Sequence, residues 1–122
     1  MGQDIEFWEA VKKIRAKDNR FKPEAYPFVM ESLEYTIQRV GERRHVTALE
    51  LLDGLCLYSK QRFGLLAPDV LENWGIQDAF DVGLAVFHLV EAGVLARQDS
   101  DQLEDFQVNY DLWEMLGDEY FA

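Results

Sequence analysis

The chain has 122 residues, a formal net charge of −11 and 48% apolar residues. This length and apolar share are typical of one globular domain, which buries enough surface to fold without a disulfide or a metal. The single cysteine excludes an intramolecular disulfide, so we expect a reducing, cytoplasmic setting rather than a secreted disulfide scaffold. The sequence also lacks the apolar run of a signal peptide and any stretch long enough to span a bilayer.

The charge is distributed unevenly along the chain. Eleven of the 12 lysines and arginines lie in residues 1–62, together with 10 acidic residues. Residues 63–122 hold 13 acidic residues and a single base, Arg97. The first part therefore has a net charge of +1 and the second a net charge of −12. An acidic surface of this kind favours solubility and repels nucleic acid and anionic lipid.

Apolar periodicity predicts two helices at the N-terminus. The first runs from about Ile5 to Lys17. The second follows Pro23 and ends before Gly41, a residue type that commonly ends helices. We treat residues 1–41 as an N-terminal helical pair.

Three further helices are expected at residues 47–63, 68–74 and 78–92. Thr47 and Glu50 have the spacing of a capping box, in which each side chain bonds the other residue's backbone amide. Asp78 is a suitable first cap for the last of the three helices. That helix is apolar on most sides, which predicts a central, buried position.

Residues 94–97 and 103–108 fit two short strands around a turn-rich loop, and a last helix is expected over Asp111–Tyr120. Three helices followed by a hairpin match the order of a winged helix-turn-helix. The expected fold is thus mainly α: a single domain over 1–122, with a winged-helix-like core at 46–109 and a C-terminal helix at 110–122. An all-α bundle is the alternative.

The usual function of a winged helix is inconsistent with these charges. In DNA-binding members the third helix enters the major groove and the wing contacts phosphate. Here that helix carries Asp78, Asp81 and Glu91, without a lysine or arginine. Such a surface repels the DNA backbone. Two nucleic-acid alternatives stay open: binding through the basic N-terminal half, and acidic mimicry of DNA.

Aromatic anchors among charged residues are typical of protein interfaces. We therefore expect a non-catalytic interaction or assembly module that uses an acidic C-terminal face. Its partner would be a basic protein surface, and a second copy of the chain offers one such surface. The expected partner-binding residues are Asp78, Asp81, Asp99, Asp101, Glu104 and Asp105 for charge, with Trp74 and Phe106 as anchors.

The acidic residues after Gly93 do not form a calcium loop. Asp99 and Asp101 match positions 1 and 3 of an EF-hand, but Glu104 occupies the glycine position and Tyr110 the final glutamate position. The sequence therefore predicts no calcium site of this kind.

Other metal and catalytic signals are also missing from the sequence. His45, His88 and Cys56 are too few for a structural zinc site. The phosphate-binding, dinucleotide-binding, acyl-transfer and zinc-hydrolase motifs are absent from the chain. We expect no cofactor, no metal and no enzymatic activity.

Several short segments taken together resemble a family of small, uncharacterised bacterial proteins of about this length. The resemblance extends from about Phe7 to Phe106. It implies a bacterial, cytoplasmic, single-domain protein, and it supplies no activity and no site residue. The segments are AYPFV (25–29), RHV (44–46), LLDGL (51–55), FGLLA (63–67), VLENWGI (70–76) and DVG (81–83).

Overall fold

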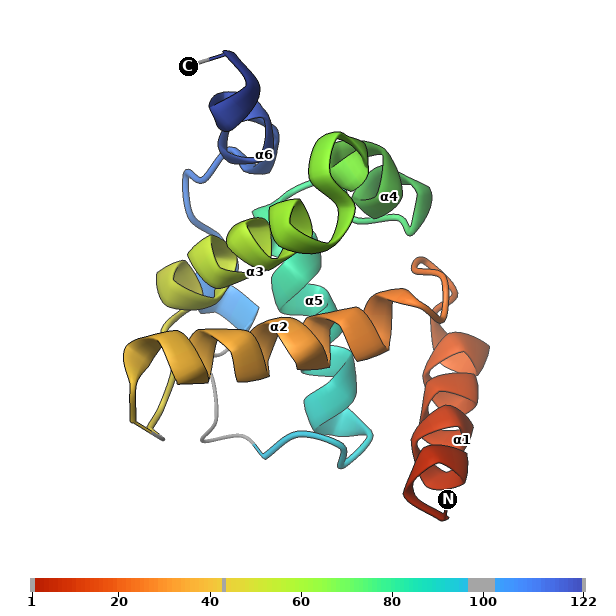
Figure 1. Ribbon diagram of the computed structural model, residues 1–122. Coiled ribbons are helices and arrows are strands. Elements are labelled where there is room, and N and C mark those ends of the chain that lie inside the picture. The colour runs from red at the N-terminus through yellow and green to blue at the C-terminus, as the bar shows by residue number, and fades with distance from the viewer. Residues whose placement is uncertain (1, 43, 97–102, 122) are drawn as a thin grey trace.

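The structure, a computed structural model, describes residues 2–42, 44–96 and 103–121, and its regular elements in these ranges are all helical. Figure 1 shows α2 and α3 side by side, α5 crossing behind them, and α1 and α6 at opposite ends of the molecule. The elements are α1 (Gly2–Lys17), α2 (Ala25–Val40), α3 (Ala48–Phe63), η1 (Gly64–Leu66), α4 (Ala67–Asn73), α5 (Ala79–Glu91), η3 (Leu103–Phe106) and α6 (Leu112–Phe121).

Local capping chemistry sets the helix ends that the sequence predicts. Glu50 N donates to Thr47 Oγ1 at 3.2 Å, and Thr47 N donates to Glu50 Oε1 at 3.0 Å, so the capping box is confirmed. Asp78 caps α5 by accepting from Asp81 N at 2.9 Å. Gly41 ends α2 with a φ of 87°, a left-handed conformation that other residues adopt only with strain.

The core lies where α2, α3 and α5 meet, and these helices contribute many of its buried side chains. Phe21, from the loop between α1 and α2, is also fully buried. α1 buries only part of its surface, through Val11 and Ile14. The buried residues of the three central helices include Tyr26, Phe28, Val29, Leu51, Leu52, Leu55, Val82, Ala85 and Leu89.

The mainly α prediction is confirmed, but the winged-helix hairpin is wrong for the residues that the structure describes. Leu103–Phe106 form a 3₁₀-helix, and residues 94–96 form no strand; residues 97–102 lie outside the described ranges. The reason is visible in the spacing. Leu103 and Phe106 are three residues apart, the period of a 3₁₀-helix, so they share one face and leave Glu104 and Asp105 exposed.

Phe106 is 1% exposed because it packs against a glycine on α5. A Cβ on Gly83 would lie 2.5 Å from both Cβ and Cγ of Phe106. The absence of that side chain lets η3 approach the α5 backbone closely. The position of η3 therefore depends on Gly83.

Gly83→Ala is expected to lower the free energy of unfolding by about 1–3 kcal/mol, because overpacking outweighs the better helix propensity of alanine. Urea denaturation measures the change. Phe106→Leu provides a double-mutant cycle: the double variant should lose less than the sum of the single losses, because the two residues contact each other. Strictly additive losses, or a stabilised Gly83→Ala variant, would contradict this packing.

Candidate functional site

The outward side of α5 carries an apolar stripe. Phe80, Leu84 and Phe87 are spaced four and three residues apart, so they lie on one face of the helix, and Glu91 continues that line. Phe80 and Leu84 are half-buried, and Phe87 is 37% exposed. We call these four residues the α5 face.

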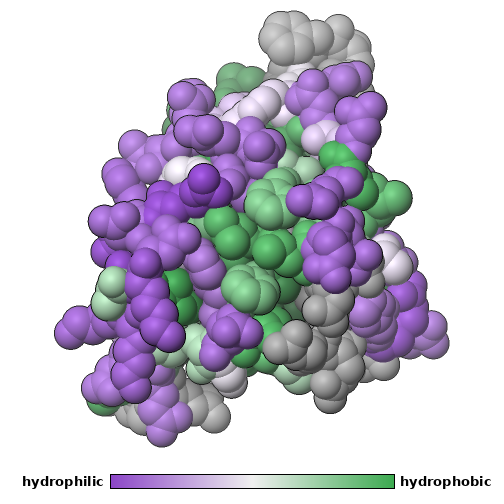
Figure 2. Space-filling model, turned by 180° about the vertical axis from the view of Figure 1, so that it is seen from behind, coloured by the Kyte–Doolittle hydropathy of each residue, from purple (hydrophilic) through white to green (hydrophobic). Residues whose placement is uncertain are grey.

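Other sides of α5 pack against α2, α3 and η3. Figure 2, which views the molecule from the side where α5 lies in front, shows apolar residues gathered at the centre of the surface with polar residues around them. A stripe of large apolar side chains left partly in water is a common mark of a binding surface.

One flank of the α5 face is acidic. It is formed by η3, where Phe106 packs against Gly83 and the exposed residues Glu104 and Asp105 follow one another. Exposed Asp78 adds a carboxylate at the start of the helix. Within the described ranges, residues 63–96 and 103–121 contain no lysine or arginine, so this part of the chain adds no positive charge to the flank.

The opposite flank is the loop between α1 and α2, which is pinned to α5. Arg20 Nη1 donates to Asp81 Oδ1 at 3.0 Å, and Asp81 Oδ2 also accepts from the backbone amide of Gln77 at 2.8 Å. This flank carries the bases Lys17 and Arg20. In Figure 1 the loop and η3 lie on opposite sides of α5.

His88 joins the same loop to the core. Its Nδ1 lies 3.0 Å from the hydroxyl of Tyr26, and its Nε2 lies 3.4 Å from Asp18 Oδ2. Burial raises the pKa of Tyr26 to about 12, so the phenol keeps its proton. The contacts fit a neutral imidazole that accepts from Tyr26 at Nδ1 and donates to Asp18 at Nε2. Burial accordingly lowers the pKa of His88, although Asp18 opposes the shift.

A groove of about 670 Å³ lies between α1 and α5, and His88 is part of its wall. Both bases and acids line it on the α1 side, and Phe87 and Glu91 line it from α5. The charged residues on the α1 side are Lys13, Lys17, Glu6, Glu9 and Asp18. The groove therefore continues the α5 face towards α1, with charges of both signs.

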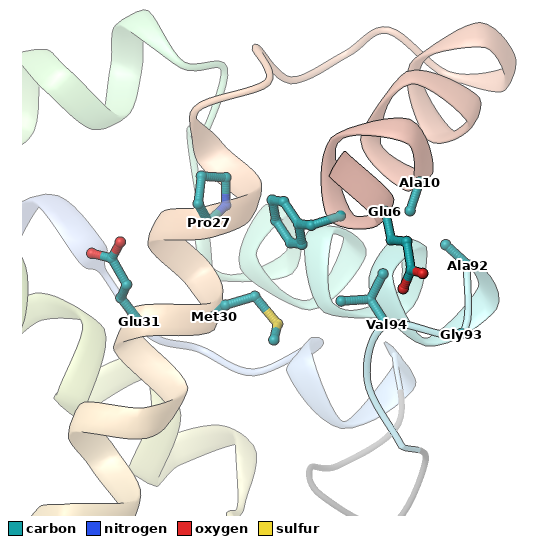
Figure 3. A pocket seen from close by; sticks show the side chains of 9 residues that line it. Glu6, Ala10, Pro27, Met30, Glu31, Ala92, Gly93 and Val94 are labelled. Atoms are coloured by element: carbon teal, nitrogen blue, oxygen red, sulfur yellow. The ribbon is translucent and has the colours of Figure 1, made fainter. Parts of the chain in front are cut away.

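A second groove, of about 660 Å³, lies on the other side of α1, against α2 and the end of α5. Figure 3 shows Met30, Pro27 and Val94 around it, with the carboxylates of Glu6 and Glu31 at opposite edges. Glu31 accepts from Tyr58 and from Arg62, at 2.7 Å in each case. This hollow is mainly apolar and brings together no acid–base pair for catalysis among its lining residues.

Three of the residues predicted to bind a partner are buried or half-buried and contact other parts of the chain. Asp81 is buried and pairs with Arg20, and Phe106 is buried against Gly83. Trp74 is half-buried, with its ring centroid 5.3 Å from that of Phe28.

The other predicted residues lie nearer the surface. Asp78 is exposed and caps α5, while Glu104 and Asp105 are exposed on η3. Asp99 and Asp101 lie outside the described residues. Asp78 thus lies at the start of α5, and Glu104 and Asp105 lie on the acidic flank formed by η3.

The sequence reasoning missed the α5 face itself. Because α5 is apolar nearly all round, its pattern predicts burial of Phe80, Leu84 and Phe87 as well. Their spacing by four and three residues was the available signal. Arg20 and His88 had no such signal, since their partners are distant in sequence.

In the described part of the chain, no group of three or more histidine, cysteine, aspartate or glutamate side chains could hold a metal ion. Cys56 is buried, and burial raises the pKa of its thiol to about 11. A thiol in this environment stays protonated near neutral pH and is a poor nucleophile.

No protein-family model matches the sequence, and no curated protein or solved structure matches it. The resemblance to a bacterial family therefore stays a prediction. Among the described helices, none has the length and apolar character needed to cross a membrane.

Asp81→Ala is expected to lower the free energy of unfolding by about 1–2 kcal/mol, because Gln77 N–H and Arg20 lose their acceptor. Glu104→Ala, at an exposed position, should change it by less than about 0.5 kcal/mol. Urea denaturation measures both variants. Equal midpoints for the two would show that the Arg20–Asp81 contact contributes nothing measurable.

The lowered pKa of His88 predicts a loss of stability on acidification. The histidine of the unfolded chain, whose pKa has the ordinary value of 6.5, gains a proton before the folded one does. The contribution of neutral His88 to the free energy of unfolding is therefore fully present above pH 6.5. It decreases as the pH falls from 6.5 towards the lower pKa of the folded state. Unfolding measured from about pH 7.5 to about pH 5.5 should show a smaller decrease for His88→Gln than for the wild type. Equal decreases for the wild type and His88→Gln would contradict this linkage.

Proposed function

We propose that the chain is a non-catalytic protein interaction module that binds a basic, amphipathic partner through the α5 face and its acidic flank. The observation that supports this most strongly is the apolar stripe of Phe80, Leu84 and Phe87 beside the exposed carboxylates of η3. Apolar side chains supply affinity when they leave water, and surrounding charges select the partner and speed its approach.

The stripe has the residue spacing of a helix-binding surface. Its residues follow the i, i+4, i+7 pattern by which one helix contacts another. Burying an aromatic or aliphatic side chain of this size contributes about 1.5–3 kcal/mol. Three such residues are enough to anchor a helix, with the η3 carboxylates facing its basic side.

The nucleic-acid alternative has less support, because much of the basic charge is already paired within the chain. Arg20 pairs with Asp81 at 3.0 Å, while Arg44 pairs with Glu50 and Arg62 with Glu31, both at 2.7 Å. These arginines would have to give up internal partners to bind phosphate. Exposed lysines remain on α1, but few phosphate contacts give weak, strongly salt-dependent binding.

Catalysis by His88 also has little support. Both ring nitrogens have partners, Tyr26 and Asp18. In the described ranges, no serine, threonine or cysteine side chain hydrogen-bonds to this histidine as an activated nucleophile would.

The proposal can be tested with a synthetic amphipathic peptide of about 18 residues that has a leucine stripe flanked by lysines. Fluorescence anisotropy should show binding that weakens as NaCl rises from about 0.05 M to about 0.5 M. Phe87→Glu should weaken binding by roughly tenfold or more, because it puts a charge on the apolar anchor. Leu65→Glu is the matched control: Leu65 is 70% exposed but lies in η1, away from α5.

A second peptide with glutamates in place of the lysines tests the charge selection. It should bind roughly tenfold more weakly than the lysine peptide. Equal binding of the two peptides, or equal effects of Phe87→Glu and Leu65→Glu, would contradict the proposed surface. Binding of a DNA duplex at low salt, without binding of the lysine peptide, would favour the nucleic-acid alternative.

A further inference from the structure

We infer that the partner of the α5 face is a second copy of this chain, which packs its own α5 alongside the first in parallel about a twofold axis. This inference rests on the proposed function of the same surface and names its occupant. It follows from two features: the spacing of the apolar residues, and the opposite charges of the two flanks.

The spacing of the α5 face suits pairing of two identical helices. Phe80, Leu84, Phe87 and Glu91 are separated by four, three and four residues, which is the alternation that forms the contact line of a two-stranded coiled coil. In a parallel, in-register pair, Phe80, Leu84 and Phe87 each meet their own copy, and the like-charged copies of Glu91 meet at the end of the stripe. The apolar part of the stripe is then buried on both protomers at once.

The flanks determine the direction of pairing. A twofold axis parallel to α5 places the η3 flank of one protomer over the α1–α2 loop flank of its partner. The carboxylate of Glu104 then faces Lys17 and Arg20 of the other copy. An axis perpendicular to α5 would give antiparallel helices and place η3 against η3, acid against acid. The charges of the two flanks therefore favour the parallel arrangement, although it brings the two copies of Glu91 together at the end of the stripe.

The two flanks also contact α5 at neighbouring positions along its length, which agrees with this arrangement. Arg20 bonds Asp81 near the start of α5, and Phe106 packs against Gly83 two residues further on. A twofold axis parallel to α5 does not shift one protomer along the helix relative to the other. The guanidinium of one protomer and the η3 carboxylates of its partner therefore lie at similar positions along the helix axis. Arg20 still has N–H groups to offer, since its side chain is 49% exposed.

The basic flank also contains two acids, Asp18 and the exposed Glu24. The carboxylate of Asp18 is engaged within the chain: Oδ2 contacts His88 at 3.4 Å, and Oδ1 accepts from Arg20 N at 3.0 Å. Lys17 and Arg20 are thus exposed beside these acids, of which Asp18 is already bonded within the chain.

Sedimentation velocity from about 10 to about 200 µM protein tests the dimer, with the full chain as it is. We expect a monomer–dimer equilibrium that shifts towards monomer at about 0.5 M NaCl. Phe87→Glu should raise the dissociation constant by roughly tenfold or more, and Leu65→Glu should leave it unchanged. Circular dichroism of each variant separates a lost interface from a lost fold.

Charge variants test the flanks. Glu104→Lys should weaken the dimer by roughly tenfold, because it places a lysine opposite Lys17 and Arg20 of the partner. Glu72→Lys, the same change at an exposed position on α4, should leave the dimer unchanged. Equal effects of the two variants would contradict the assignment of the flanks.

An engineered cysteine tests the direction. Glu91→Cys should form a disulfide-linked dimer under mild oxidation, because a parallel pair brings the two copies of position 91 together. An antiparallel pair would place them at opposite ends of the interface. The native Cys56 is buried, so the wild-type protein should form no crosslink under the same conditions and is the control. A dimer that forms without this crosslink would overturn the parallel arrangement.

The two proposals can fail separately. A monomer that binds the lysine-flanked peptide overturns the self-association and leaves the interaction surface intact. A monomer that binds neither peptide overturns both. A dimer that Phe87→Glu does not weaken places the contact elsewhere and overturns the inference.

Discussion

The packing of the α1–α2 loop onto α5 sets the position of α1, of both grooves and of the basic flank. Arg20 reaches Asp81, Asp18 reaches His88, and Phe21 is buried beneath them. The turn after α4 holds the loop from another side. There Lys22 N donates to Trp74 O at 3.0 Å, and a Cβ on Gly75, whose φ is 95°, would lie 2.6 Å from the carbonyl oxygen of Arg20. Few residues therefore position a whole helix.

The helix ends were predictable because their chemistry is local. Thr47 with Glu50, Asp78, and Gly41 each act within one turn of their own helix, so a short window of sequence contains the whole interaction. The segment after Gly93 was not predictable in this way. Its apolar residues fit two short strands as well as a 3₁₀ turn, and the choice depends on Gly83, some twenty residues earlier.

The candidate site was predicted in its charge and not in its geometry. Asp81 has the same local pattern whether it is exposed or buried, and its partner Arg20 lies 61 residues away. The α5 face has the opposite difficulty. Nearly continuous apolar character suggested burial on every side, but α2, α3 and η3 leave the line of Phe80, Leu84 and Phe87 partly in water. Contacts between distant segments decided both outcomes.

The close approach of Phe106 to Gly83 has a consequence for the surface as well as for the core. It fixes how far Glu104 and Asp105 stand from the apolar stripe, and at which height along the helix they stand. A protein with the same acidic composition and a larger residue at position 83 would present those charges in a different place. The pattern that a partner meets is thus specified by the size of one residue that no partner touches.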